Sequence, residues 1–465
     1  MTDFAALLRP DRDEPATPIH LLDKKLSTEW IKRFAGQRRA LIDAAGFDGS
    51  AGQLLVLPGS APDRIEVLVG TADAAALTPW CLASAADKLP TGSYRLAGEV
   101  QPGLAPLGWL LAQHRFERYK SKPPEPKGPR VLLTRDPAKV DEIVRLAGAT
   151  ALVRDLVDTP AADLGPAQLE QAVRDLAAEC GGSVTVTSGD DLERGFPMVA
   201  AVGAAAVPAR APRMIELEWG RTDAPRLAVV GKGVCFDSGG LDLKPASGMR
   251  LMKKDMGGAA HALALARLIV AERWPVRLHL LIPAVENAVA GGAFRPGDVL
   301  HSRAGLRVEI DNTDAEGRLI LGDALTRAGE GKPQLIVDFA TLTGAARVAL
   351  GPDLPATFVN DDSLAGELLK AAAETHDPLW RMPLWDGYDD MMKSDVADLV
   401  NSADGPFAGS VTAALFLRRF VPADTPWAHL DTFAWRPAAK PGRPKGGEAL
   451  GLRAVHAALK NRFGA

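Results

Sequence analysis

The sequence predicts an α/β protein with a smaller amino-terminal α/β domain followed by a larger domain built on a doubly wound, mostly parallel sheet. Three observations favour this fold class. Strand-like and helix-like patterns alternate through the second half of the chain, as in a parallel sheet covered by helices on both faces. A proline-rich stretch, residues 121–129, interrupts the earlier part. The 465 residues, 47% of them hydrophobic, are enough for two or three domains with sizeable cores.

The amino-terminal part mixes strand-like stretches, such as residues 64–69 (RIEVLV), with helical ones. The prolines of 121–129 (SKPPEPKGP) cannot continue a helix or a central strand, so this stretch is a candidate domain border. It could also be a loop inside the first domain, because residues 131–134 (VLLT) could return as its last strand. We predict an amino-terminal α/β domain over 1–135, with an oligomeric or regulatory role, and a catalytic domain over 136–465.

The second domain is expected to alternate between helices and strands. The expected helices span 136–157, 166–180, 258–272 and 318–328, and the expected strands span 213–218, 227–230, 276–283, 306–310 and 335–340. In such sheets ligands bind beyond the carboxyl ends of the strands. Polar residues that follow these strands are therefore the first candidates for a site.

Composition excludes several classes of protein. The net charge is −4, from 58 acidic and 54 basic residues, and no basic block indicates binding to nucleic acid or anionic lipid. Three widely separated cysteines, Cys81, Cys180 and Cys235, argue against a disulfide framework and for a reducing compartment. The start of the chain lacks a secretory pattern, and no run approaches eighteen apolar residues. We therefore expect a cytoplasmic protein that does not associate with membranes.

An acidic turn at 311–322 (DNTDAEGRLILG) separates a strand-like run from a helical one. A calcium loop counted from Asp311 would need an oxygen ligand at its fifth position and Gly at its sixth, where the chain has Ala315 and Glu316. The turn alone is thus compatible with a solvated connection or with a cation site. A cation site would need further carboxylates from elsewhere in the chain.

A second polar stretch, residues 231–260, follows the expected strand 227–230. It contains Lys232 between two glycines, Asp237 before Ser-Gly-Gly, Lys244 before Pro245, and Asp255 before Met-Gly-Gly. The glycines let the backbone turn tightly and bring these charges close to a ligand. Dinucleotide and phosphate-loop fingerprints fail here, and neither HExxH nor GxSxG occurs in the chain.

Together the two stretches offer four carboxylates: Asp237, Asp255, Asp314 and Glu316. Each has an ordinary alternative role, as a helix cap or a turn former. Carboxylates that converge in one crevice repel unless cations neutralise them. Their hard oxygen ligands suit Mn²⁺ or Mg²⁺ and permit Zn²⁺, and four of them are enough for two bridged ions. Lys232 could join such a site only as a neutral amine.

The motifs resemble those of a known family. VGKGVCFDSGG (230–240), MKKDMGGAA (252–260), NTDAEGRLIL (312–321) and ATLTGA (340–345) closely resemble segments of the leucyl aminopeptidases, the M17 family of two-metal exopeptidases. The resemblance runs through most of the second half, including WAHLD (427–431), and is poor in the first 120 residues. Two departures are Cys235, where the family usually has Thr, and Asp158, where it usually has Asn.

The resemblance implies roles for individual residues. The ligands of two divalent ions would be Lys232, Asp237, Asp255, Asp314 and Glu316. Lys244 would polarise the substrate carbonyl, and Arg318 would hold a bicarbonate that serves as general base for the bridging water. The substrate would be bound by Met252, Asn312, Thr341, Leu342 and Gly344. The implied activity is release of amino-terminal, leucine-like residues from peptides with a free N-terminus, by a homohexamer.

Two alternatives stay open on the sequence alone. Some bacterial members of this family also bind DNA as regulators, so a nucleic-acid partner is not excluded. The metal ligands alone would also permit another two-metal hydrolase, such as a phosphoesterase.

Overall fold

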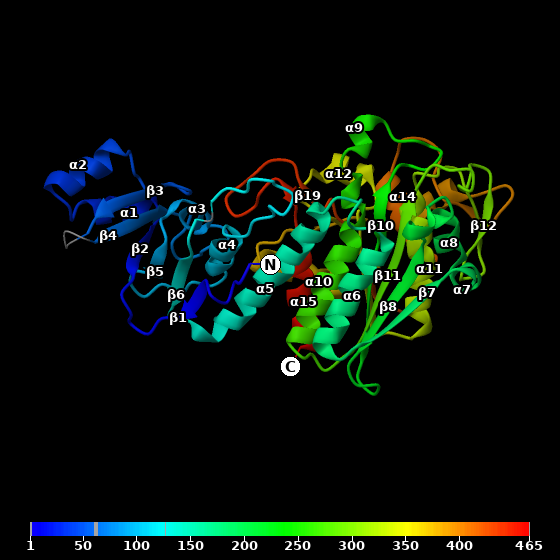
Figure 1. Cartoon of the computed structure of the whole chain (residues 1–465), viewed down its shortest axis with the longest axis horizontal. Coiled ribbons are helices and arrows are strands. Elements are labelled where there is room, and N and C mark those ends of the chain that lie inside the picture. The colour runs from blue at the N-terminus through cyan, green and yellow to red at the C-terminus, as the bar shows by residue number, and fades with distance from the viewer. Residues whose placement is uncertain (1, 60–63, 126, 465) are drawn as a thin grey trace. The chain divides into compact units, whose positions relative to one another are not determined.

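The computed structural model describes residues 2–59, 64–125 and 127–464. The chain forms two compact units, one comprising Met1–Ala151 with Ala438–Lys445 and the other Leu152–Pro437 with Gly446–Ala465 (Figure 1). The division falls within helix α5 (Val140–Asp158), which follows the short 3₁₀ helix η1 (Pro137–Lys139).

The first unit is a mixed sheet with helices. Its strands in the described residues are ordered β1-β6-β5-β2-β4-β3, and only the β3–β4 pair is antiparallel. Residues 131–134 do form a strand of this sheet, because Tyr94 and Leu132 pair within β5 and β6. The elements are β1 (Leu8–Pro10), β2 (Thr17–Leu22), α1 (Lys24–Ile31), α2 (Gly36–Ala44), β3 (Leu54–Pro58), β4 (Ile65–Gly70), α3 (Ala83–Lys88), β5 (Gly92–Leu96), α4 (Ala105–Leu111) and β6 (Arg130–Thr134).

The second unit contains the large sheet that the alternating pattern predicts. Its order is β16-β15-β18-β14-β9-β11-β8-β7, and β10 also pairs with β11. The central strands β18, β14, β9 and β11 are parallel, whereas β15, β8 and β7 run antiparallel to their inner neighbours. The strands are β7 (Ser183–Ser188), β8 (Arg213–Trp219), β9 (Arg226–Gly231), β10 (Gly233–Asp237), β11 (Arg277–Asn287), β14 (Leu335–Ala340), β15 (Ala356–Val359), β16 (Trp380–Arg381) and β18 (Trp427–Asp431).

The expected strand 306–310 forms as β13 (Arg307–Glu309) but lies outside this sheet. It pairs with β12 (Val299–His301) and β17 (Leu399–Val400) in a separate three-stranded sheet. The strand is short and ends in charged residues on both sides of the buried Val308. It therefore has too little apolar surface for the centre of a sheet that is covered on both faces.

Helices cover both faces of the large sheet, as the fold class requires (Figure 1). On one face α10 (Gly257–Ala271) packs on β9, β14 and β11, and α6 (Pro166–Cys180), α13 (Asp362–Glu374) and α15 (Leu452–Phe463) extend this layer. On the other face α8 (Pro197–Gly203), α11 (Glu316–Glu330) and α14 (Gly409–Arg418) share one apolar core with the strands. Helix α10 is apolar almost all round, because it is buried between the sheet and α15.

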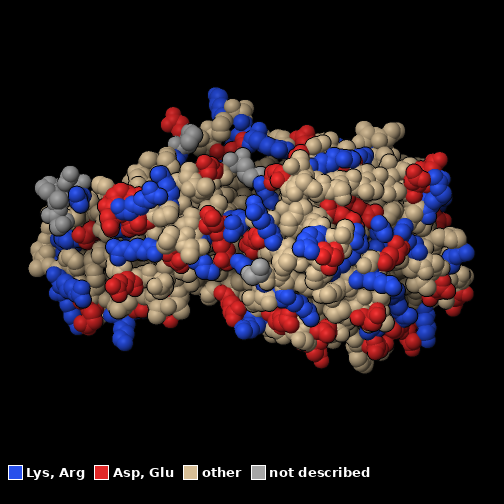
Figure 2. All heavy atoms as spheres, turned by 90° about the horizontal axis from the view of Figure 1, so that it is seen from below, with Lys and Arg blue, Asp and Glu red and all other residues tan. Residues whose placement is uncertain are grey.

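The remaining helices are short. They are α7 (Asp190–Gly195), η2 (Pro208–Arg210), α9 (Ala246–Met249), η3 (Met252–Met256), α12 (Gly344–Leu350) and η4 (Asp386–Met392), and a two-stranded sheet pairs β19 (Trp435–Arg436) with β20 (Gly446–Gly447). In the part of the chain that the structure describes, every helix is too short or too polar to cross a membrane. On the face shown in Figure 2, acidic and basic side chains are interspersed over the surface.

Candidate functional site

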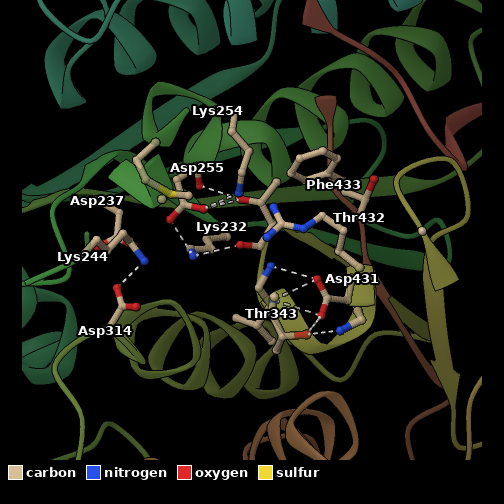
Figure 3. Close-up of a pocket in the computed structure, with 18 of the residues that line it drawn as sticks. Lys232, Asp237, Lys244, Lys254, Asp255, Asp314, Thr343, Asp431, Thr432 and Phe433 are labelled. Carbon is tan, nitrogen blue, oxygen red and sulfur yellow. Dashed lines mark hydrogen bonds and ion pairs between the residues drawn. The ribbon is translucent and has the colours of Figure 1, made fainter. Parts of the chain in front are cut away.

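A pocket of about 280 Å³ opens where the central strands of the large sheet end (Figure 3). Strand β9 ends one residue before Lys232, β10 ends at Asp237, β14 ends one residue before Thr341, and β18 ends at Asp431. All four residues line the pocket. The location agrees with the rule that open α/β sheets bind ligands beyond the carboxyl ends of their strands.

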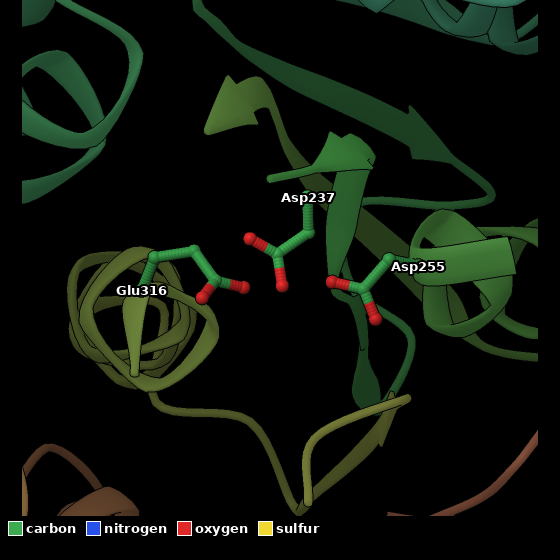
Figure 4. Close-up of side chains that lie close together, drawn as sticks. All are labelled: Asp237, Asp255 and Glu316. Carbon is green, nitrogen blue, oxygen red and sulfur yellow. The ribbon is translucent and has the colours of Figure 1, made fainter. Parts of the chain in front are cut away.

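Three buried carboxylates converge beside this pocket (Figure 4). Asp237 comes from the end of β10, Asp255 from η3, and Glu316 is the first residue of α11. One oxygen from each lies within 4.8 Å of the others. Buried carboxylates this close repel one another strongly unless cations lie between them. The structure thus brings together three of the predicted ligands from three separate segments.

Two lysines lie between pairs of these carboxylates. Lys232 Nζ is 2.7 Å from Asp255 Oδ2 and 3.0 Å from Glu316 Oε1. Lys244 Nζ is 2.8 Å from Asp237 Oδ2 and also contacts Asp314 Oδ1 (Figure 3). Each ammonium therefore bridges two carboxylates, and the fourth predicted carboxylate, Asp314, joins the cluster through Lys244.

Hydrogen bonds from neighbouring segments fix the carboxylates. Asn287 Nδ2 and the Gly239 N–H each donate to Asp237 Oδ1 at 2.9 Å. The Thr341 hydroxyl donates to Asp255 Oδ1 at 2.9 Å. The second oxygen of Asp237 faces Lys244, and the second oxygen of Asp255 faces Lys232. Among the described residues, Asp255 Oδ2 and Glu316 Oε1 have no hydrogen-bond partner besides the Lys232 ammonium.

The electrostatic environment gives the carboxylates different pKa values. Burial, with the charge of Asp237, raises the pKa of Glu316 to about 8, and burial likewise raises the pKa of Asp314 to about 6. Burial alone would raise the pKa of Asp255, but Lys232 lowers it to about 2. Burial would lower the pKa of Lys232, yet the carboxylates around it raise that pKa above the usual range. A cation that recruits the Lys232 amine as a ligand must therefore displace a proton.

Two glycines leave the space that the side chains of Lys232 and Asp314 occupy. A Cβ on Gly317, in the first turn of α11, would lie 2.6 Å from Lys232 Nζ. Gly239 has φ +90°, and a Cβ there would lie 2.5 Å from Asp242 O and 3.1 Å from Asp314 Oδ1. Side chains at these positions would collide with the charged cluster, which explains the glycines in both motifs.

The segment 341–344 lies beside the carboxylates and is held by Asp431. The Leu342 N–H donates to Asp431 Oδ1 at 2.9 Å, and the Thr343 hydroxyl donates to Asp431 Oδ2 at 2.6 Å. The Thr341 carbonyl accepts from Lys232 Nζ at 3.2 Å. Thr341, Leu342 and Gly344 all line the pocket, but the N–H groups of Leu342 and Thr343 are already bonded to Asp431.

The other predicted site residues differ in how they face the pocket. Met252 lines it, whereas Asn312 and Arg318 are absent from its described lining. Asn312 Oδ1 accepts from the Asp314 N–H at 2.8 Å, so this side chain orders the acidic turn. Arg318 is buried, donates from Nη1 to Asn401 O at 2.8 Å, and has no hydrogen-bond partner for Nε among the described residues. Burial lowers the pKa of Arg318 to about 10.

The two departures noted in the sequence lie outside the pocket lining. Cys235 is fully buried in β10, and burial raises the pKa of its thiol. Asp158 ends α5, accepts from the Gly447 N–H at 2.8 Å, and has its pKa raised by burial. Both residues support local packing.

Sequence reasoning missed five residues that shape the pocket. They are Asn287, Asp431, Lys254, Arg347 and Phe433. Lys254 had a visible signal, because it stands beside Asp255 in the MKKDM segment. Its ammonium is buried 3.1 Å from Asp255 Oδ1, and burial lowers its pKa. Asp431 is the last residue of WAHLD, which was notable only as part of the resemblance.

Comparisons with known proteins agree with this site. The model of the cytosol aminopeptidase family catalytic domain matches residues 151–456, and that of the M17 aminopeptidase N-terminal domain matches residues 17–127. A probable cytosol aminopeptidase from Syntrophotalea carbinolica is 44% identical over 362 residues, covering 74% of this chain and 72% of that protein.

Solved structures are also similar over nearly the whole chain. The crystal structure of a cytosol aminopeptidase from Coxiella burnetii has a TM-score of 0.92 and 44% identity, and the match covers 98% of this chain and 99% of that one. The bottromycin maturation enzyme BotP, in complex with Mn, has a TM-score of 0.86 and 32% identity, with 97% and 100% covered.

Proposed function

Because this chain belongs to the cytosol aminopeptidase family, whose members are metal-dependent hydrolases, we propose that its pocket removes amino-terminal residues from peptides with the help of two divalent ions. The observation that carries this proposal is the convergence of Asp237, Asp255 and Glu316 within 4.8 Å, with Lys232 and Lys244 between the carboxylates. We propose domain limits of 1–135 and 136–465, the second domain being catalytic.

The residues present fit a pair of cations. Among residues 2–59, 64–125 and 127–464, two buried carboxylate oxygens, Asp255 Oδ2 and Glu316 Oε1, contact only the Lys232 ammonium and would be satisfied by a divalent ion. The ligands would be Lys232, Asp237, Asp255, Asp314 and Glu316, which supply hard oxygens and one amine. With the Lys232 amine added to the carboxylates, the set suits Mn²⁺ or Zn²⁺ and permits Mg²⁺. BotP, a structural neighbour, is in complex with Mn. Bound ions would acidify and orient the attacking water.

The chain's own residues would complete the reaction. Lys244 Nζ lines the pocket between Asp237 and Asp314, where an ammonium can stabilise the oxyanion that forms on the substrate carbonyl. The segment held by Asp431, with Met252 and Asn312 as neighbours, would position the peptide. Arg318, whose buried Nε has no hydrogen-bond partner in the described part of the chain, would bind a bicarbonate that accepts the proton of the water.

The finer assignments rest on the family. We propose a leucine-like preference for the first residue, which the apolar side chains of Met252, Leu354 and Phe433 in the pocket support. We also propose a cytoplasmic location, consistent with three free cysteines, and assembly as a homohexamer. The matched family models and the named cytosol aminopeptidases favour this function over a phosphoesterase or a DNA-binding regulator.

The proposal can be tested with chelator-stripped protein and leucine p-nitroanilide. Mn²⁺, Zn²⁺, Mg²⁺ and Co²⁺ are added back separately, and N-acetyl-leucine p-nitroanilide is the matched control because it lacks the free amine. Metal-restored release from the free-amine substrate alone is the expected result. If p-nitrophenyl phosphate were hydrolysed instead, the phosphoesterase alternative would replace this proposal. Salt-sensitive binding of duplex DNA without peptidase activity would favour the regulator.

A further inference from the structure

One end of the pocket carries two cations that the hydrolytic chemistry does not use. Lys254 Nζ lies 5.7 Å from the centre of the Phe433 ring, and Arg347 Cζ lies 4.8 Å from the same centre. All three residues line the pocket. Contacts of this kind hold a cation beside an aromatic face and so restrict where its remaining hydrogen-bond donors can point.

Nearby carboxylates do not neutralise Arg347. The guanidinium forms no hydrogen bond or ion pair with any described residue, and the group it contacts is the Phe433 ring. Asp431, the acidic residue at the same end of the pocket, is occupied by the N–H groups of Leu342 and Thr343 and by the Thr343 hydroxyl. Arg347 is exposed, so its donors are open to water and available to a ligand.

Lys254 extends this positive end toward the carboxylate cluster. Its Nζ is 3.1 Å from Asp255 Oδ1, while Asp255 Oδ2 is held by Lys232. Asp255 thus lies between two ammonium groups. Its single negative charge is divided between Lys232 and Lys254 and does not fully balance Lys254. Apolar side chains, including Met252, Leu354 and Ala346, line the rest of this region. The pocket combines an apolar wall with a cationic end, which matches an aliphatic group that ends in a carboxylate.

We propose that Arg347, assisted by Lys254, binds a carboxylate of the substrate, so that carboxylate-bearing peptides are hydrolysed in preference to amides of the same shape. This inference rests on the proposed aminopeptidase function. Arginine is suited to the role because its planar guanidinium stays charged and can bind a carboxylate through two hydrogen bonds. The carboxylate could be the side chain of an acidic first residue or the carboxyl terminus of a dipeptide.

Two matched substrate pairs separate these sources. Glutamate and glutamine p-nitroanilides differ at the side chain alone, and Leu-Leu and Leu-Leu-amide differ at the terminus alone. We expect kcat/KM to be at least about tenfold higher for the carboxylate member of one pair, the usual effect of a charge-assisted hydrogen bond. The pair that shows the preference identifies the source.

Variants test whether Arg347 causes the preference. Arg347→Gln should lower the carboxylate-to-amide ratio of kcat/KM at least about tenfold, and Arg347→Lys should restore part of it because the charge remains. Lys254→Met should also lower the ratio. Arg250, which is exposed and outside the described lining, provides the matched control, since Arg250→Gln removes the same charge from the neighbouring surface.

The outcomes are distinguishable. Hydrolysis of all four substrates with no preference in either pair would overturn the inference and leave the aminopeptidase function intact. An equal loss of the ratio in Arg250→Gln would also overturn it, because general charge attraction would then explain the preference. Failure to hydrolyse any free-amine substrate would instead refute the proposed function.

Discussion

Replacing Gly317 with alanine should disable the site without unfolding the protein. Gly317 lies between Glu316 and Arg318 at the start of α11, and a Cβ there would lie 2.6 Å from both Cε and Nζ of Lys232. Lys232 cannot move freely, because Asp255, Glu316 and the Thr341 carbonyl hold its ammonium at 2.7, 3.0 and 3.2 Å. The methyl group must therefore displace the amine from the carboxylates.

The expected change in stability combines two opposing effects of the added methyl group with the weakening of the Lys232 ion pairs. Alanine is favoured over glycine inside a helix by about 1 kcal/mol. Overpacking a buried site by one methyl group costs about 1–3 kcal/mol. Packing and helix propensity alone should lower the free energy of unfolding by about 0–2 kcal/mol, and the weakened ion pairs of Lys232 should lower it further. The value of kcat/KM should fall at least about a hundredfold because a proposed ligand and its neighbours are displaced.

The assays are leucine p-nitroanilide hydrolysis, Mn²⁺ titration by calorimetry, and urea unfolding. Gly366→Ala is the matched control, because Gly366 lies inside α13 and a Cβ there would have nothing within 4 Å. That variant should gain up to about 1 kcal/mol and keep full activity. Full activity and unchanged Mn²⁺ affinity in Gly317→Ala would refute the idea that Lys232 must occupy its position.

Further predictions concern the charged residues of the site. Asp255→Ala should abolish turnover while circular dichroism shows a folded protein. Lys244→Met should lower kcat by two or more orders of magnitude at saturating substrate, since it removes a partner of the oxyanion. Asp431→Asn should raise KM about tenfold, because it weakens the bonds that hold Thr343. Folding raises the pKa of Glu316 from 4.5 to about 8, so chelator-stripped protein should lose thermal stability as pH rises through this interval. Glu316→Gln should remove that pH dependence of stability. An unchanged dependence of the melting temperature on pH in this variant would contradict the prediction.

The sequence predicted the regular elements best where capping residues accompany a clear apolar period. The expected helix 166–180 coincides with α6, because Pro166 begins it and Gly181, with φ +72°, ends it. The expected strand 335–340 coincides with β14. The placement of β13 could not be predicted, because periodicity indicates a strand but not which sheet it joins.

In the site, too, the residues in local motifs could be predicted, whereas the contacts between distant segments could not. The four carboxylates were recognisable because each stands in a short motif that directly follows a strand or precedes a helix. Their supporting partners were not, because Asn287 reaches Asp237 across 50 residues and Asp431 reaches Thr343 across 88. Arg347 carries no local signal, since an arginine on a short helix usually faces solvent, and this one is exposed as well. Only the folded chain brings it beside Phe433.

The lysines explain how so acidic a cluster can belong to a folded chain. Leaving several buried carboxylates unpaired would cost several kcal/mol for each charge. Lys232 and Lys244 each bridge two of the four, which balances half of the negative charge, and Lys254 adds a third ammonium beside Asp255. Divalent ions that enter the cluster would compete with these ammonium groups and would also neutralise the negative charge that the lysines leave. Metal affinity should therefore rise with pH, because the amine of Lys232 must lose its proton before it can become a ligand.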